Sequence, residues 1–192
     1  MIPTPRLSHL SAEDFDLVYE PAEDTFILLD ALEQDAEDLR TGIENKVTFL
    51  LSTPITTQLY VLRQIPLNPI NASFALPFHS RLAHAIDVIL FNPPYVPTII
   101  SEVSEAQDIK GIAGSWAGGS DGMQVTNRFL EMVADLLSPR GRFYLVAVKE
   151  NNIPEIQHRM LNTYGLKSTI VLSRRAGREH LSVIRFTRMS SS

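Results

Sequence analysis

The apolar run DVILF, residues 87–91, is followed directly by Asn92-Pro93-Pro94-Tyr95, four residues that could hold a planar nitrogen group. The Asn92 side chain offers a carbonyl oxygen as a hydrogen-bond acceptor. Pro93 offers a backbone carbonyl whose direction the proline ring helps to fix, and Tyr95 offers a flat face against which a planar group can pack. Two acceptors and a flat wall suit an amide or amine nitrogen that carries N–H groups.

Methyl transfer is the reaction that such a site could assist. The lone pair of an amide nitrogen is delocalised into its carbonyl, which makes the nitrogen a poor nucleophile. Acceptors that hold both N–H groups let the lone pair turn toward an electrophile, so catalysis would be mainly positioning, which can contribute on the order of 7–11 kcal/mol. The structural alternative is a proline turn that only ends a buried strand. The complete tetrapeptide directly after DVILF favours the functional interpretation.

Apolar spacing predicts the elements around this motif. A helix is expected from about Pro21 to Leu39, because proline suits a first helical turn, and Glu23 and Asp24 suit its positive end. Helical spacing recurs at residues 123–137 and 153–165, with a turn at 138–141. Strands are predicted at residues 47–53, 58–65, 87–91 and 142–148, and a hairpin at 166–187.

Strands that alternate with helices indicate an α/β fold, here with an antiparallel C-terminal edge. In open parallel sheets, chemistry lies just beyond the carboxyl ends of the strands. Asn92 follows the strand predicted at residues 87–91, so the sequence places it at such an end.

Composition limits the classes of protein. The 192 residues are 44% hydrophobic and contain no cysteine, which excludes disulfides and thiolate metal sites. No run approaches the roughly 18 apolar residues of a membrane span, and no secretory signal is visible. The five histidines are scattered without ligand spacing, so no metal site is expected. We expect a cytoplasmic protein, and the sequence does not separate the cytoplasm from the nucleus.

Charge argues against a nucleic-acid-binding protein. The formal net charge is −5, which does not suit bulk neutralisation of phosphates. Arginines do gather near the C-terminus, where they could meet RNA or an acidic partner. We interpret them instead as a solvated strand face and turn. They are Arg174, Arg175, Arg178, Arg185 and Arg188.

Six sequence matches make the chain similar to the class I, S-adenosylmethionine-dependent methyltransferases that carry an Asn-Pro-Pro-Tyr motif. Within them it most resembles the HemK-like group, the eukaryotic glutamine methyltransferases of translation termination. The matches are YEPAEDTF (19–26), FNPPYVPT (91–98), SWAGGSDG (115–122), LLSPRGRFYLV (136–146), KENN (149–152) and SRRAGREHLSVIRF (173–186).

The resemblance implies one methyltransferase-like domain over residues 1–192, with a Rossmann-like sheet that ends in an antiparallel hairpin. The N-terminal helix would occupy residues 19–40, the cofactor region 41–86 and the half that carries the substrate motif 87–188. It also implies a heterodimer with a small zinc-binding activator subunit. A membrane role is not implied.

The substrate implied by the resemblance is the glutamine in the Gly-Gly-Gln loop of the eukaryotic class-1 release factor, methylated at N5. Asn92 and the Pro93 carbonyl would be the catalytic groups that hold the glutamine amide. Pro94 and Tyr95 would shape the pocket, and Trp116 would lie near its entrance. The alternative for Trp116 is a surface loop.

The resemblance implies S-adenosylmethionine as the methyl donor. Its candidate contacts are Tyr19, Pro21 and Thr25 in the helix-start sequence, together with Asn92. For the first three, helix capping and packing are equally good explanations.

The donor site expected of the family is incomplete in residues 41–86. The family carries a strand, a loop close to E-x-G-x-G-x-G and a second strand that ends in a ribose-binding acid. The segment contains one glycine, Gly42, and one acid, Glu44. Its 46 residues cannot hold three strand-helix units, because one βαβ unit takes about 30. We therefore expect a shortened N-terminal half of the sheet and weak or absent donor binding.

Two alternative functions remain open. The first is a catalytically impaired isoform or remnant that keeps the substrate pocket and partner surface. The second is a histone-lysine or DNA adenine-N6 methyltransferase, since an adenine amino group would also suit Asn92. The negative charge disfavours DNA.

Overall fold

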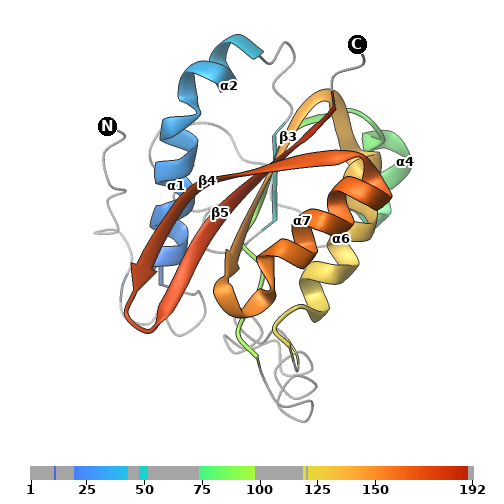
Figure 1. Ribbon diagram of the computed structural model, residues 1–192. Helices are drawn as coiled ribbons and strands as arrows, with labels where there is room; N and C mark the ends of the chain where they lie inside the picture. The colour runs from blue at the N-terminus through green and yellow to red at the C-terminus, as the bar shows by residue number, and fades with distance from the viewer. Residues whose placement is uncertain are drawn as a thin grey trace.

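The described strands form one five-stranded sheet in the order β1-β2-β3-β5-β4. The computed structural model describes Ser11, residues 20–42, 48–51, 74–97, Gly119 and residues 121–189 (Figure 1). Strands β1 (Thr48–Leu51), β2 (Ile86–Phe91) and β3 (Leu137–Val148) are parallel. Strand β5 (Glu179–Arg188) is antiparallel to β3, and β4 (Leu166–Ala176) is antiparallel to β5. The predicted α/β sheet with an antiparallel C-terminal hairpin is confirmed.

Helices cover both faces of the sheet (Figure 1). One face carries α1 (Glu23–Gln34) and α2 (Ala36–Gly42). The other carries α4 (His79–Leu82), α6 (Gln124–Leu136) and α7 (Ile153–Tyr164). Short 3₁₀ turns lie at Leu76–Phe78 and Lys149–Asn151. None of the helices in the described ranges is long and apolar enough to cross a membrane.

Alternation along β3 divides its side chains between two hydrophobic clusters. Phe143 and Leu145 join the cluster with α6 and α7, whereas Tyr144 and Val146 join the cluster with α1. All four are fully buried. This period of two is what a strand packed on both faces requires.

The helix predicted from about Pro21 to Leu39 is confirmed except at Asp35, where the chain breaks between α1 and α2. The Asp35 carboxylate accepts a 2.7 Å hydrogen bond from the Tyr144 hydroxyl and another of 2.7 Å from Arg185. Burial and this carboxylate both raise the pKa of Tyr144. A side chain fixed by two partners in the sheet explains why the helix pauses here.

The turn predicted at residues 138–141 is wrong, because these residues lie within β3 as a bulge. Leu137 pairs with Ile86, and the next pair is Arg142 with Val88, so β3 inserts extra residues. A Cβ on Gly141 would lie 2.8 Å from the Ile86 carbonyl oxygen. Glycine therefore lets the strands approach closely at the bulge.

The interpretation of the C-terminal arginines as one solvated face is wrong for three of them. Arg185 pairs with Asp35 of the α1–α2 junction. Arg174 pairs with Asp30 and, at 3.6 Å, with Glu23, both on α1. Arg188 donates to the Leu137 carbonyl at 3.0 Å, and only Arg175 and Arg178 are exposed. The acidic partner of this tract is largely the chain's own N-terminal helical layer.

Gly122 holds the segment after Asn92 in place. Its φ is +71°, and its N–H donates to the Gly119 carbonyl at 3.0 Å. A Cβ at this position would lie 2.1 Å from the Tyr95 carbonyl oxygen. The approach is closer than any side chain permits, so glycine is required.

We predict that Gly122→Ala lowers the free energy of unfolding by about 2–5 kcal/mol, from left-handed backbone strain plus overlap. Gly165→Ala is the matched control, because Gly165 has a φ of +65° but an added Cβ there would have no neighbour within 4 Å. The control should lose only about 1–2 kcal/mol. Urea unfolding of both variants measures the difference, and equal losses would contradict the close contact with Tyr95.

Candidate active site

Asn92 stands directly after β2, at the carboxyl end of a parallel strand, as the sequence predicts. Every residue of β2 is buried, and Asn92 itself is 9% exposed. The first turn of α1 lies against it and brings Asp24, which is 6% exposed. Two polar side chains 68 positions apart in sequence thus meet at one edge of the sheet.

A hydrogen bond fixes the orientation of the Asn92 amide. Its Nδ2 donates to Asp24 Oδ2 at 2.8 Å. The other carboxylate oxygen, Oδ1, accepts from the Thr25 backbone N–H at 2.7 Å. A carboxylate can only accept, so the nitrogen of the Asn92 amide must face Asp24 and the oxygen must face away.

The Asn92 Oδ1 atom is buried and has no hydrogen-bond partner among the described residues. Leaving a buried acceptor unpaired costs about 1–3 kcal/mol, so native proteins rarely do so without a reason. Asp24 maintains this arrangement by occupying the donor side of the same amide. The unpaired oxygen is what a site for a ligand N–H group requires.

The rest of the predicted tetrapeptide is also located. Pro93 and Tyr95 are buried, and Pro94 is half-buried. The Tyr95 ring packs in the cluster beneath α1, and its hydroxyl donates to Glu179 Oε2 at 3.5 Å. A hydrogen bond from a substrate N–H to the Pro93 carbonyl stays a prediction, as does the role of the Tyr95 ring.

Besides Asn92, two of the candidate donor contacts lie among the described residues. Pro21 is half-buried just before α1. Thr25 is fully buried, and its hydroxyl lies 3.4 Å from Asp24 Oδ1, which gives it a packing role beneath that carboxylate. Tyr19 and Trp116 lie outside the described residues. Contact of any of these residues with a cofactor or substrate stays a prediction.

Acidic side chains gather beside the Tyr95 hydroxyl. Burial of Glu179 raises its carboxyl pKa, and the nearby charges of Asp24 and Glu150 raise it further. The hydrogen bond from Tyr95 opposes this shift. Within the described ranges, no group of three or more His, Cys, Asp or Glu is arranged to hold a metal ion.

Sequence reasoning missed Asp24, Asn151 and Glu179 as members of this site. Asp24 looked like an acid that only complements a helix N-terminus. Asn151 Nδ2 donates to the Tyr95 carbonyl at 3.3 Å, and its Oδ1 accepts from the Val148 N–H at 2.9 Å. The sequence did hold a signal for them, because all three lie within sequences that match the family: YEPAEDTF, KENN and SRRAGREHLSVIRF.

Several proteins are similar to this chain, although no family model matches it. The human "Methyltransferase HEMK2" is 40% identical, over 96% of this chain and 96% of the human protein. The catalytic subunit of the eRF1 methyltransferase of Schizosaccharomyces pombe, mtq2, is 36% identical, over 100% of this chain and 98% of that protein.

The same alignments show that this chain is shorter than its relatives. The alignment with the human protein spans 212 positions, and the alignment with the fission-yeast protein spans 231, whereas this chain has 192 residues. These relatives therefore contain at least 20 and 39 residues, respectively, that have no counterpart in this chain.

A solved structure shares the fold. It is Mtq2 in the E. cuniculi Mtq2-Trm112 complex, described as responsible for methylation of the translation termination factor eRF1. The TM-score is 0.62 at 26% identity, over 90% of this chain and 99% of that one. With near-complete coverage by relatives at 36–41% identity, the chain belongs to the HEMK2/Mtq2 family of eRF1 glutamine methyltransferases.

Proposed function

We propose that this chain methylates N5 of the glutamine in the Gly-Gly-Gln loop of the class-1 release factor eRF1, with S-adenosylmethionine as donor. The observation that carries the proposal is the buried, unpaired Oδ1 of Asn92, held in place by Asp24. The names of the fission-yeast and E. cuniculi relatives, which refer to eRF1 methylation, support the choice of substrate.

In this proposal the chain contributes orientation. Asn92 Oδ1 accepts one N–H of the glutamine amide, and the Pro93 carbonyl accepts the other. Held at both N–H groups, the nitrogen can present its lone pair out of the amide plane. The dry surroundings strengthen these hydrogen bonds, because little water competes for them. Asp24 prevents the Asn92 amide from turning its NH₂ group toward the substrate.

We also propose a heterodimer with a small zinc-binding activator subunit of the Trm112 type. The E. cuniculi relative was solved in a complex with Trm112, and it shares the fold of this chain.

The residues present do not fit the usual donor site. In doubly wound folds the strand order is 3-2-1-4-5-6, and the glycine-rich turn follows the first strand, which lies beside the fourth. Strand β2, which precedes Asn92, corresponds to the fourth strand. Strand β1 holds that position beside β2. After Leu51 the sequence continues Ser-Thr-Pro, and no glycine occurs before Gly111. A glycine-loop mode of donor binding is therefore not available after β1, which favours an impaired enzyme as the second candidate function.

We predict that Asn92→Ala lowers kcat/KM for release-factor methylation on the order of 10²-fold, a loss comparable to removing one preorganised hydrogen-bonding group. Methyl incorporation from labelled donor, at one fixed donor concentration for both proteins, measures the change. The same substitution at the matching asparagine of the human relative tests the motif in a longer member of the family. Undiminished glutamine methylation by both variants would refute the proposal.

Asp24 should act as a positioning residue. Asp24→Ala frees the Asn92 amide to rotate and should lower kcat on the order of tenfold, whereas Asp24→Asn keeps one of the two acceptor oxygens and should lose less activity. Thermal melting of both variants separates this effect from unfolding. Equal losses in the two variants would show that one remaining oxygen does not orient the Asn92 amide, and would contradict this positioning role.

For the donor, we predict a dissociation constant of roughly 1 mM or weaker by isothermal titration with S-adenosylmethionine. The human relative, titrated alongside, is the control. Replacing residues 41–86 with the corresponding human segment should restore binding, since it would return the missing loop. Micromolar affinity of the unmodified chain would show that it holds the donor by another route.

A further inference from the structure

The turn of the β4–β5 hairpin lies beside the candidate site. Leu181 of β5 pairs with Val148, the last residue of β3, so the residues before Leu181 extend past the end of β3. At about 3.3 Å per residue, Arg178 lies roughly 10 Å beyond that edge. The contact of Glu179 with the Tyr95 hydroxyl links the turn to the segment after Asn92.

The hairpin is held firmly where it leaves the sheet. Arg174 forms ion pairs with Glu23 and Asp30 of α1. Ser173 and Ser182 share a hydrogen bond of 2.9 Å across the two strands. The turn is therefore a fixed feature of this edge, and its position relative to Asn92 is set by the fold.

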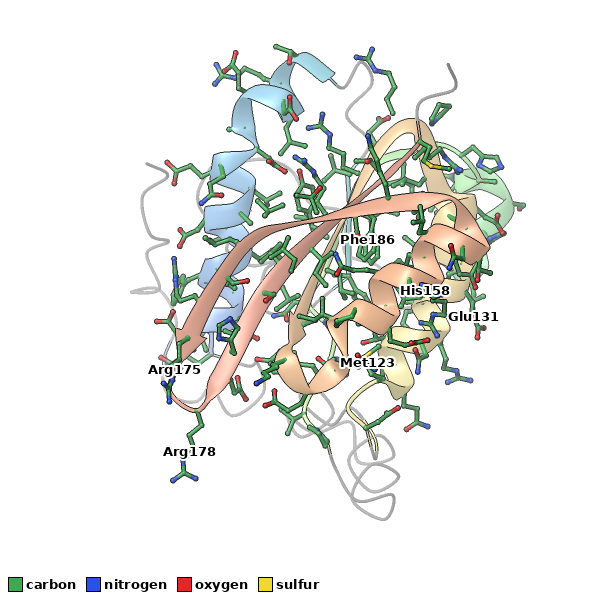
Figure 2. All side chains as sticks on the ribbon, viewed as in Figure 1. Met123, Glu131, His158, Arg175, Arg178 and Phe186 are labelled. Atoms are coloured by element: carbon green, nitrogen blue, oxygen red, sulfur yellow. The ribbon has the colours of Figure 1, made fainter. Side chains whose placement is uncertain are left out.

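Two exposed arginines, Arg175 and Arg178, form the outer surface of the turn (Figure 2). Neither forms an ion pair within the described part of the chain, unlike Arg174, Arg142 and Arg185. In Figure 2 the Arg178 side chain extends away from the body of the molecule. Of the acids beside the turn, Asp24 is buried and Glu179 is half-buried, whereas Glu150 is exposed. A surface that approaches the turn itself therefore meets two guanidinium groups.

We propose that this turn docks an acidic surface of the protein substrate next to its glutamine-bearing loop. The inference rests on the proposed function. Arginine binds carboxylates in a two-pronged geometry, and charges at a rim mainly speed association and select partners. RNA is a poorer occupant, because two arginines on a chain of net charge −5 neutralise too few phosphates.

The test compares Arg175→Glu/Arg178→Glu with wild-type protein, each in complex with its Trm112-type partner. The affinity for eRF1 should fall about tenfold, with a weaker dependence on salt than wild type shows. The KM for a short Gly-Gly-Gln peptide should not change. Arg175→Lys/Arg178→Lys, which keeps the charge, should stay within about twofold of wild type.

The matched control is Arg81→Glu/Arg140→Glu. Both arginines are exposed and lie at the opposite edge of the sheet: Arg81 in α4, before β2, and Arg140 in the β3 bulge. It changes the net charge equally and should leave eRF1 affinity intact. Unchanged affinity of the hairpin variant for eRF1 would overturn the inference. An equally large rise in the KM for the short peptide would also overturn it, as would dissociation of the Trm112-type subunit or a loss of affinity for RNA alone. If wild type binds eRF1 without methylating it, only the proposed function fails, because the affinity comparison still decides the docking role.

Discussion

The hydrogen bond between Asn92 and Asp24 is the contact on which the site depends. It requires that the first turn of α1 lie over the carboxyl end of β2, because the two residues are 68 positions apart. Packing of Ile27 and Leu28 against Val88 and Leu90 produces that arrangement. The helical layer thus serves two purposes: it covers one face of the sheet and supplies the carboxylate that orients a catalytic amide.

The same helical layer is fixed to the sheet at its other end. Tyr144 and Arg185 both bind Asp35 at the junction of α1 and α2. Arg174 binds Asp30 and Glu23 from the hairpin. Charge-assisted hydrogen bonds of this kind depend on geometry, so they set the tilt and rotation of α1 as well as adding stability. The position of Asp24 is therefore determined over the whole length of the helix.

Much of this arrangement could be predicted from the sequence, and the reasons differ between elements. DVILF and RFYLVAV are short buried runs bounded by turn residues, so strands β2 and β3 were predictable, as was Asn92 at a strand end. The break at Asp35 was not, because it depends on Tyr144 and Arg185, which are 109 and 150 positions away. The bulge was missed because Ser-Pro-Arg-Gly is normally a turn sequence. Asp24 was missed because an acid in a first helical turn usually faces solvent, and only the fold shows that this one is buried.

The β3 bulge has a consequence for the register of the strand that precedes Asn92. Residues upstream of Val88 pair in one register and those from Val88 onward in another, with the mismatch absorbed at 138–141. Pairing of Val88 to Phe91 with β3 therefore does not inherit the register of Ile86, which a uniform ladder would transmit as a slip of every side chain to the wrong face. The extra residues of β3 at 138–141 are thus accommodated while Asn92 keeps its place. The register at the amide-binding edge is thus set from Val88 onward, by β3 on one side and by β1 on the other.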